Sequence, residues 1–365
     1  MTLPVRHDSA GNPSPYRRLT VLLDIPTPQR VPLLDRIAEA TEVLVLYLGA
    51  GDEGRGWGAL ELGHPHLFLS QRKSSALVTC LRVLWSRRDS VFWCSGYDHP
   101  VKALSMVFAR LLRTTLVMRS DSNVDREQRH SSRRRAVKKA FLLAVIGRST
   151  RVWTIGHRNE EYWRVYGFHN CRLIPYTVPR PPQSAGVEPA ETAALRATDA
   201  CIFLYVGRLH LHQKGLADLL LAVQELPRGR RDWRLVLIGD GPGRSAAEDA
   251  ARTDPRVLAL GARNQDALAA WYKLADAVIV PSHNEPWGLV VNEARLAGKY
   301  VIASDAVGSA HDLLTDCEAG AVYPCGDVAA LRQHLIAALA TPRRSPGALI
   351  EVDAAKLVLQ ELRRG

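Results

Sequence analysis

The residues from Asp276 to Gly298 restrict the possible folds of this chain more than any other stretch. Ala277 to Val280 form a short, largely β-branched apolar run that Pro281 ends, which is typical of a buried parallel strand. Polar residues follow, and from Leu289 onwards apolar residues recur at helical spacing until Gly298. The stretch therefore predicts a strand, a loop and a helix, the repeating unit of α/β folds with a parallel sheet.

The loop between this strand and this helix has the chemistry of an anion site. A loop from the carboxyl end of a parallel strand into a helix directs free N–H groups and the positive end of the helix dipole to one spot. Glu285 lies in this loop, and Glu293 lies beyond Gly288, about 7.5 Å further along the helix. Carboxylates accept hydrogen bonds from paired hydroxyls, so the spacing suits a sugar and a ribose on either side of a diphosphate.

This loop and helix resemble the donor-site motif of a known enzyme family. Glu285 and Glu293 are separated by seven residues within Glu-Pro-Trp-Gly-Leu-Val-Val-Asn-Glu-Ala, which resembles the retaining glycosyltransferases of family 4. That family has the GT-B fold, so the resemblance implies an α/β chain with two Rossmann-like domains that face each other across a cleft. Two glutamates at this spacing are more often a solvated helix face, but the preceding strand and the other motifs favour a functional site.

A second motif lies at the start of the other half of the expected site. Cys201 to Val206 are apolar, and Gly207-Arg-Leu-His-Leu-His-Gln-Lys-Gly215 follows them. This segment resembles the family's Gly-Arg-Leu…Lys-Gly element, with one residue more than the common form, and a surface turn with two cations is the alternative. The resemblance implies catalytic roles for Arg208, Lys214 and Glu285, and donor-binding roles for Gly207, Gly239, Arg263, Gly288, Leu289 and Glu293.

The first half of the chain matches the family less closely. The loop after the strand at Leu19 to Leu23 carries Pro26, Thr27 and Pro28 where family members usually have glycines. Relatives commonly carry a histidine at about Asp121, so the resemblance implies a catalytic position near the acceptor there. The candidate acceptor-binding residues, which lie at expected strand ends or in the loops that follow them, are Gln29, Arg30, Asp98, His99 and Arg119. Ordinary turns are the alternative interpretation.

Length and proline content predict the domain boundaries. A chain of 365 residues exceeds one ordinary core and fits two domains. Prolines are concentrated between Tyr176 and Ala190, as in a linker. We expect an acceptor-binding Rossmann-like domain at residues 1–180, a linker at 181–195, a donor-binding Rossmann-like domain at 196–345 and a C-terminal helix at 346–365.

The positive charge of the chain belongs to its first half. Residues 1–180 contain 28 Lys and Arg against 15 Asp and Glu, whereas residues 181–365 contain 20 against 22. This charge favours anionic partners. The basic segment 126–139 is expected to contact an anionic membrane or a phosphorylated acceptor, with a solvated helix face as the alternative. No nucleic-acid recognition motif or series of stacking aromatic residues is present, so no nucleic-acid partner is expected.

The remaining composition indicates a cytoplasmic protein without a cofactor. The six cysteines show no metal-site spacing and are typical of reduced thiols, and no apolar run approaches the roughly 18–20 residues of a membrane span. Membrane contact through residues 126–139 would place the protein at the inner membrane face. With no Asp-x-Asp pair or His cluster, neither a metal nor a cofactor is expected beyond the nucleotide sugar, which is a co-substrate.

These features lead to one expected function and two alternatives. The expected function is a retaining transfer of a sugar from a nucleotide-diphosphate sugar to a hydroxyl of a polysaccharide, glycolipid or natural-product acceptor. The first alternative is a nucleotide-sugar epimerase or phosphorylase of the same architecture. The second is a non-catalytic homologue that binds sugar nucleotides. The sequence does not specify the nucleotide, the sugar or the acceptor.

Overall fold

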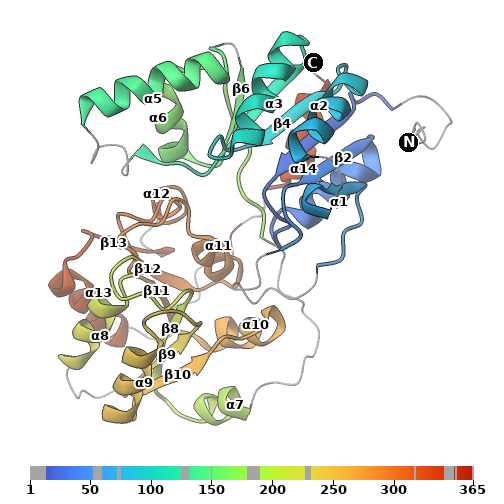
Figure 1. Ribbon diagram of the computed structural model, residues 1–365. Helices are drawn as coiled ribbons and strands as arrows, with labels where there is room; N and C mark the ends of the chain where they lie inside the picture. Colours follow the sequence, from blue (N-terminus) through green and yellow to red (C-terminus); the bar gives the residue numbers. More distant parts are fainter. Residues whose placement is uncertain are drawn as a thin grey trace. The chain divides into compact units, whose positions relative to one another are not determined.

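The chain forms two α/β units (Figure 1). The first comprises Met1–Pro179 together with Val352–Gly365, and the second comprises Arg180–Glu351. The computed structural model describes residues 14–51, 60–71, 75–124, 131–148, 150–178, 190–226, 232–315, 318–340, 349 and 352–363. The end of the chain therefore returns to the first unit after the second is complete.

The first unit is built on a parallel sheet of seven strands in the order β3-β2-β1-β4-β5-β6-β7. Its strands are β1 (Leu19–Leu23), β2 (Val43–Tyr47), β3 (His66–Phe68), β4 (Val91–Ser95), β5 (Thr115–Arg119), β6 (Arg151–Thr154) and β7 (Cys171–Leu173). The strand order reverses between β1 and β4, which lie next to each other. In open α/β sheets, ligands bind outside the carboxyl ends of the strands at such a reversal.

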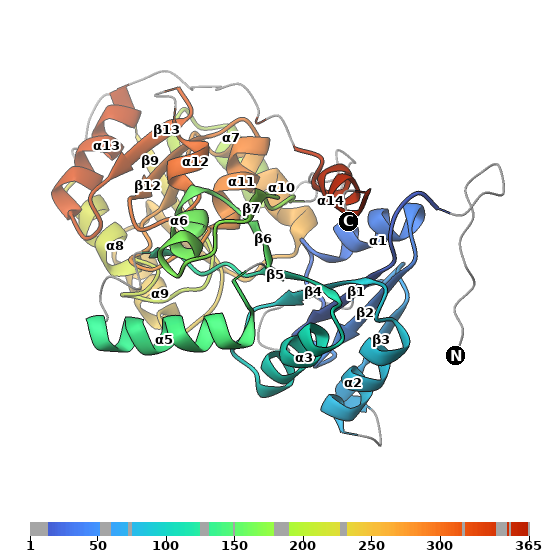
Figure 2. The same cartoon turned by 90° about the horizontal axis from the view of Figure 1, so that it is seen from above.

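Helices cover both faces of the first sheet (Figures 1 and 2). One face packs against α1 (Val31–Ala40) and α14 (Ala354–Arg363). The other packs against α2 (Ala76–Ser86), α3 (Pro100–Leu111), α5 (Ser132–Val145) and α6 (His157–Val165). Because successive side chains of a strand point to opposite faces, Trp93 of β4 lies on the α1 face and Phe92 lies on the other. Burial on both faces explains why these strands are almost continuously apolar.

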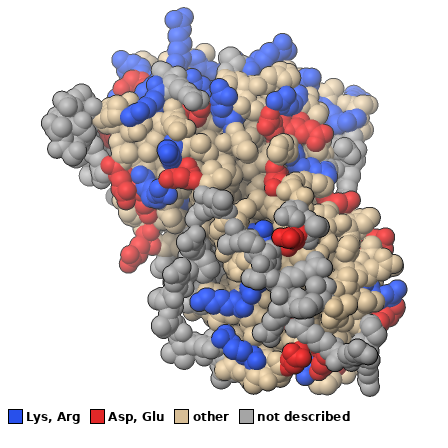
Figure 3. Space-filling model, turned by 180° about the vertical axis from the view of Figure 1, so that it is seen from behind, with Lys and Arg blue, Asp and Glu red and all other residues tan. Residues whose placement is uncertain are grey.

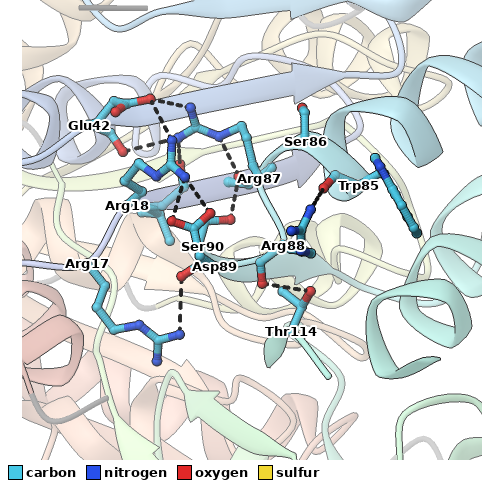
Figure 4. A network of polar contacts seen from close by, with 12 residues as sticks. Arg17, Arg18, Glu42, Trp85, Ser86, Arg87, Arg88, Asp89, Ser90 and Thr114 are labelled. Carbon is cyan, nitrogen blue, oxygen red and sulfur yellow. Dashed lines mark hydrogen bonds and ion pairs between the residues drawn. The ribbon is translucent and has the colours of Figure 1, made fainter. Parts of the chain in front are cut away.

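A polar network joins the amino ends of β1, β2 and β4 (Figure 4). The buried Arg87 donates from Nε to the Thr20 hydroxyl at 3.0 Å and forms an ion pair with Glu42. Arg18 forms an ion pair with Asp89 in the same network. Part of the positive charge of the first half therefore has a structural role, although Lys and Arg remain numerous on the surface of this unit (Figure 3).

The second unit repeats this plan with six parallel strands in the order β10-β9-β8-β11-β12-β13. Its strands are β8 (Cys201–Val206), β9 (Trp233–Ile238), β10 (Val257–Gly261), β11 (Ala277–Val280), β12 (Tyr300–Ser304) and β13 (Gly320–Tyr323). The order reverses between β8 and β11. The two strands that precede the two sequence motifs are therefore neighbours in the middle of the sheet.

Helices also cover both faces of the second sheet. One face packs against α7 (Ala190–Arg196), α10 (Gln265–Leu274), α11 (Leu289–Leu296) and α12 (Ala310–Leu313). The other packs against α8 (Leu216–Gln224), α9 (Arg244–Thr253) and α13 (Val328–Ala340). Helix α7 occupies part of the segment expected to be a linker. None of the helices in the described part of the chain is long and apolar enough to cross a membrane.

The structure confirms the strands expected at Leu19 to Leu23 and at Ala277 to Val280. Helix α10 begins at Gln265. The side chain of Asn264 caps this helix by accepting a hydrogen bond from the Ala267 N–H at 2.9 Å.

The packing of α14 against the first unit can be tested by replacing Leu362 with Ala. Leu362 is fully buried against the α1 face of the sheet. We expect the free energy of unfolding to fall by about 2–5 kcal/mol because a buried cavity replaces the side chain. The measurement is urea unfolding followed by tryptophan fluorescence.

The matched control is Leu111→Ala on α3, where the side chain is 75% exposed. This change should alter the free energy of unfolding by no more than about 0.5 kcal/mol. Equal effects of the two substitutions would contradict the packing of α14 on the first sheet.

Candidate functional site

Two loops meet at the strand-order reversal of the second sheet. One follows β8 and spans residues 207–215, and the other follows β11 and spans residues 281–288. The N–H groups of His283 and Asn284 both donate to the Gln213 carbonyl, at 3.0 and 3.3 Å. Gly215 has a φ of +65°, and a Cβ there would lie 1.8 Å from the Pro281 carbonyl oxygen. The close contact of the loops therefore requires glycine at this position.

Lys214 and Glu285 form an ion pair between these two loops. Their side chains are 23% and 18% exposed, so the pair lies at the surface but is largely sheltered. The backbone of Glu285 is fixed in turn, because its carbonyl accepts from the Gly308 N–H at 3.0 Å. The fold thus brings together two predicted site residues from separate motifs, with the next loop of the sheet supporting one of them.

Helix α11 begins beside this ion pair. Its N-cap residue Gly288 has a φ of +94°, and a Cβ there would lie 2.9 Å from a methyl carbon of Val307. The buried Ser309 hydroxyl donates to the Gly288 carbonyl at 3.1 Å. The first N–H groups of a helix have no acceptor within the helix, so those of Gly288 and Leu289 are available to a ligand.

The predicted residues of the neighbouring loops lie along the same sheet edge. Arg208 is exposed directly after β8, and its carbonyl accepts from the Tyr205 hydroxyl at 2.9 Å. Gly239 follows β9, and a Cβ there would lie 1.8 Å from the carbonyl oxygen of Gly207. Arg263 follows β10 and lies 3.8 Å from a carboxylate oxygen of Glu191 on α7. The cations and close-packed glycines therefore follow one row of loops.

Glu293 lies on α11 and is held by a neighbouring helix. The hydroxyl of the buried Tyr272 on α10 donates to its carboxylate at 2.5 Å. Burial raises the pKa of Glu293, and the hydrogen bond from Tyr272 acts in the opposite direction. The carboxylate therefore has a fixed position and an environment that disfavours its charge.

Sequence reasoning missed several supporting residues. Tyr272 and Ser309 lie outside the two sequence motifs. Each of them forms a hydrogen bond with a residue of the motif that contains Glu285 and Glu293. His283 lies in the central loop, and its ring contacts the Asp218 carboxylate at 2.6 Å. No spacing in the sequence connects these pairs, because their contacts depend on the strand order.

The acceptor-side candidates in the first unit make local contacts. Asp98 accepts from the buried Lys102 ammonium at 2.9 Å, and Asp24 lies 2.6 Å from the same ammonium. His99 caps α3, since its ring accepts from the Val101 N–H at 3.2 Å. Asp98 and His99 thus support the turn and helix in which they lie, as the ordinary-turn interpretation expects.

Arg30 and Arg119 lie close together at the same edge of the first sheet. Arg119 is 2% exposed and lies 5.2 Å from the ring centre of Tyr176, with which Arg30 forms a side-chain hydrogen bond. Burial lowers the pKa of Arg119 to about 10, and the charge of Arg30 adds to this, while Tyr176 and Asp121 oppose it. Asp121 is exposed beyond β5, and Gln29 is partly buried in the loop before α1.

Comparison with known proteins assigns the second unit to a family. The family model described as glycosyl transferases group 1 matches residues 189–351, which cover all the predicted donor-side residues. The chain therefore contains a group 1 glycosyltransferase domain. It is 36% identical over 129 residues to an uncharacterized glycosyltransferase of Methanocaldococcus jannaschii, covering 34% of this chain and 33% of that protein.

A second relative extends beyond the group 1 domain. A D-inositol 3-phosphate glycosyltransferase of Xylanimonas cellulosilytica is 34% identical over 201 residues, which are 51% of this chain and 47% of that protein. The chain thus spans about a third to a half of the length of these curated relatives.

A solved structure is similar over almost the whole chain. Anabaena HepE in complex with UDP has a TM-score of 0.67 and 17% sequence identity, covering 94% of this chain and 95% of that chain. At this identity the similarity shows the fold alone. The expected GT-B class, with an α/β chain and two parallel sheets, is confirmed.

The environment of Glu293 in the group 1 domain gives a pH-dependent expectation. Folding raises the pKa of this carboxyl, so the native state holds the proton more tightly than the unfolded chain. Stability should therefore fall as pH rises from the unfolded pKa, about 4.3, through the raised folded pKa. We expect Glu293→Gln to melt at a higher temperature than the wild type at pH 8 and to lose this advantage below pH 4.

Scanning calorimetry at the two pH values is the measurement. The control is Glu248→Gln on the exposed surface of α9. A melting temperature for Glu293→Gln that is below that of the wild type at pH 8 would contradict the assigned environment.

Proposed function

We propose that the chain is a retaining glycosyltransferase that moves a sugar from a nucleotide-diphosphate sugar to an acceptor hydroxyl. The observation that carries the proposal is the Lys214–Glu285 ion pair beside the first turn of α11. It combines a cation, free backbone N–H groups and a carboxylate at the strand-order reversal. The group 1 family match to residues 189–351 supports the same activity.

Each part of this arrangement has a role in the proposed reaction. The Lys214 ammonium has three N–H donors, so it can bind a diphosphate oxygen while it remains bonded to Glu285. Arg208 and the N–H groups of Gly288 and Leu289 stabilise the negative charge that develops as the diphosphate leaves. Glu285 is left with a further carboxylate oxygen to accept hydrogen bonds from sugar hydroxyls, and Glu293 binds the ribose.

The proposed transfer keeps the anomeric configuration. The bond from the sugar's anomeric carbon to the diphosphate oxygen breaks, and a bond to the acceptor oxygen forms on the same face. The acceptor proton passes to the departing diphosphate. Because cationic side chains and the start of a helix can stabilise the diphosphate charge, we propose a reaction that needs neither a metal nor a cofactor.

The proposal can be tested by replacing Lys214 with Met. We expect the catalytic constant for sugar transfer to fall by about 10²–10³-fold, since one stabilising donor to a developing charge is lost. Mass spectrometry of the products from a panel of nucleotide sugars and acceptors gives the rates. Nuclear magnetic resonance of the product gives the anomeric configuration.

The control is Arg252→Met on α9, a 70% exposed cation of the same unit. It should leave the rate within about twofold of the wild type. Equal rates for Lys214→Met and Arg252→Met would refute the role of Lys214, and an inverted product would refute retention.

We also propose that α5 contacts an anionic membrane surface. Val137 and Phe141, one turn apart on this helix, are 65% and 44% exposed. The exposed Arg133 and Arg134 lie one turn before Val137. Apolar side chains flanked by arginines suit the headgroup region of anionic lipids. Arg126 and Arg129 of the predicted segment 126–139 lie outside the described residues.

A neighbouring side of α5 contacts the first unit, which supports its use as a fixed surface helix. The Lys138 ammonium lies 5.7, 5.2 and 5.3 Å from the ring centres of Tyr97, Tyr162 and Tyr166. Cation–π contacts of this kind attach the helix to the first unit. Together with the free cysteines among the described residues, this leads us to propose a cytoplasmic protein at the inner membrane face.

Vesicle co-sedimentation tests the membrane proposal. The double substitution Arg133→Ala, Arg134→Ala should weaken binding to vesicles of phosphatidylglycerol and phosphatidylcholine roughly thirtyfold, since each cation contributes about 1 kcal/mol. Binding of the wild type should also weaken with salt. The control is Arg244→Ala, Arg252→Ala on α9. Equal binding by both double variants would disprove the contact through α5.

A further inference from the structure

Four buried donor atoms at one edge of the first sheet lack an acceptor. They are Thr27 Oγ1, Arg30 Nε, Ser95 Oγ and Arg119 Nη1, and no hydrogen-bond partner lies within reach of them among the described residues. Thr27 and Arg30 lie between β1 and α1, whereas Ser95 ends β4 and Arg119 ends β5. Since β1 pairs with β4 and β4 with β5, all in parallel, the four residues lie at the carboxyl edge of the sheet, at its strand-order reversal.

Strand geometry brings Ser95 and Arg119 to the same face of the first sheet. Ser95 and Arg119 are direct partners in the register of β4 and β5. Each lies two residues beyond a side chain of the α1 face, Trp93 and Val117 respectively, so both point towards the face that α1 covers.

A series of contacts connects Arg119 to Arg30 and Thr27. The Arg119 guanidinium lies over the ring of Tyr176, with 5.2 Å from its central carbon to the ring centre. Tyr176 also forms a side-chain hydrogen bond with Arg30. The backbone N–H of Arg30 donates to the Thr27 carbonyl at 3.0 Å.

The buried charge of Arg119 has few hydrogen-bond acceptors around it. It is 2% exposed, and its Nη2 donates a long hydrogen bond of 3.4 Å to the Pro175 carbonyl. The rings of Trp93 and Tyr176 lie 5.6 and 5.2 Å from the guanidinium carbon, but these ring contacts supply no in-plane acceptor for Nη1. Buried polar groups in folded proteins are normally hydrogen-bonded, so several such donors at a strand-order reversal indicate a missing acceptor.

The surrounding carboxylates do not neutralise both guanidinium groups, so an anion could bind beside them. Asp121 acts electrostatically on both Arg30 and Arg119, and Asp24 acts on Arg30. Asp24 is paired with Lys102 at 2.6 Å, so its charge is already compensated. The two guanidinium groups therefore lie near one further carboxylate, that of the exposed Asp121. Among the described contacts, Asp121 forms no ion pair with another cation. The start of α1 adds the positive end of a ten-residue helix.

We propose that Thr27, Arg30, Ser95 and Arg119 form an anion subsite that binds a phosphate group of the acceptor. Two hydroxyls and two guanidinium groups supply the donors that the oxygens of one phosphate require, and planar guanidinium groups suit phosphate geometry. This inference rests on the proposed function, because the phosphate is assigned to the acceptor. The phosphate belongs either to a soluble sugar phosphate or to a lipid headgroup.

The first test is the thermal shift of the full chain with inorganic phosphate, compared with chloride at equal ionic strength. Phosphate should raise the melting temperature of the wild type, because it binds the folded state. Arg119→Met should weaken the apparent phosphate affinity roughly tenfold or more. Ser95→Ala, a milder change that retains both arginines, should weaken it by a smaller factor.

Two controls separate this site from the donor site. Arg82→Met changes an exposed cation of α2 on the other face of the sheet and should leave the phosphate response intact. Lys214→Met should also retain it, while losing the shift caused by UDP, GDP or ADP. A variant that keeps its nucleotide shift is folded, so loss of the phosphate shift in Arg119→Met alone supports the subsite.

The second test identifies the source of the phosphate. Glucose 6-phosphate is compared with glucose, and soluble dihexanoyl phosphatidic acid with dihexanoyl phosphatidylcholine. In the wild type, glucose 6-phosphate should bind more tightly than glucose, or dihexanoyl phosphatidic acid should bind more tightly than dihexanoyl phosphatidylcholine. Arg119→Met should remove this preference.

The outcomes distinguish the two proposals. A nucleotide shift without any phosphate-specific shift in the wild type would overturn the subsite and leave the proposed transferase intact. An equal phosphate shift in Arg119→Met and Arg82→Met would also overturn the subsite and leave the proposed transferase intact. A phosphate shift that depends on Arg119, without any nucleotide binding or sugar transfer, would overturn the transferase and retain the anion site.

Discussion

Parallel pairing of β8 with β11 is the constraint on which the candidate donor site depends. Parallel strands present their carboxyl ends at one edge, and the reversal of strand order leaves these two loops adjacent. The backbone bonds from His283 and Asn284 to Gln213 then fix the loops to each other. Lys214 and Glu285 meet because of this arrangement, although 71 positions separate them in the sequence.

Close backbone contacts explain two glycines of the group 1 domain. Gly215 lies against the Pro281 carbonyl, and Gly239 lies against the Gly207 carbonyl, so that neither position has space for a Cβ. These contacts hold neighbouring loops at the sheet edge without side chains between them. The first turn of α11 begins at this same edge.

The first unit uses the same topology with different chemistry. Its β1–α1 loop carries prolines rather than glycines, and the turn candidates Asp98 and His99 hold Lys102 and the start of α3. Arg119 is buried on the α1 face, where Tyr176 brings Arg30 next to it. The two units thus share a strand order but place their cations differently: Lys214 is paired with a carboxylate, whereas no carboxylate of the described residues forms an ion pair with Arg119.

The sequence by itself determined the α/β class and the positions of most strands, and it predicted the principal donor-side residues. These depend on local patterns: β-branched runs, helical spacing and short motifs such as those around Lys214 and Glu285. Tertiary structure alone decided that Tyr272 bonds to Glu293, that Ser309 supports Gly288, and that Arg119 packs against Tyr176. The physical reason is that such contacts join residues distant in the chain, and strand order, register and side-chain direction fix them together.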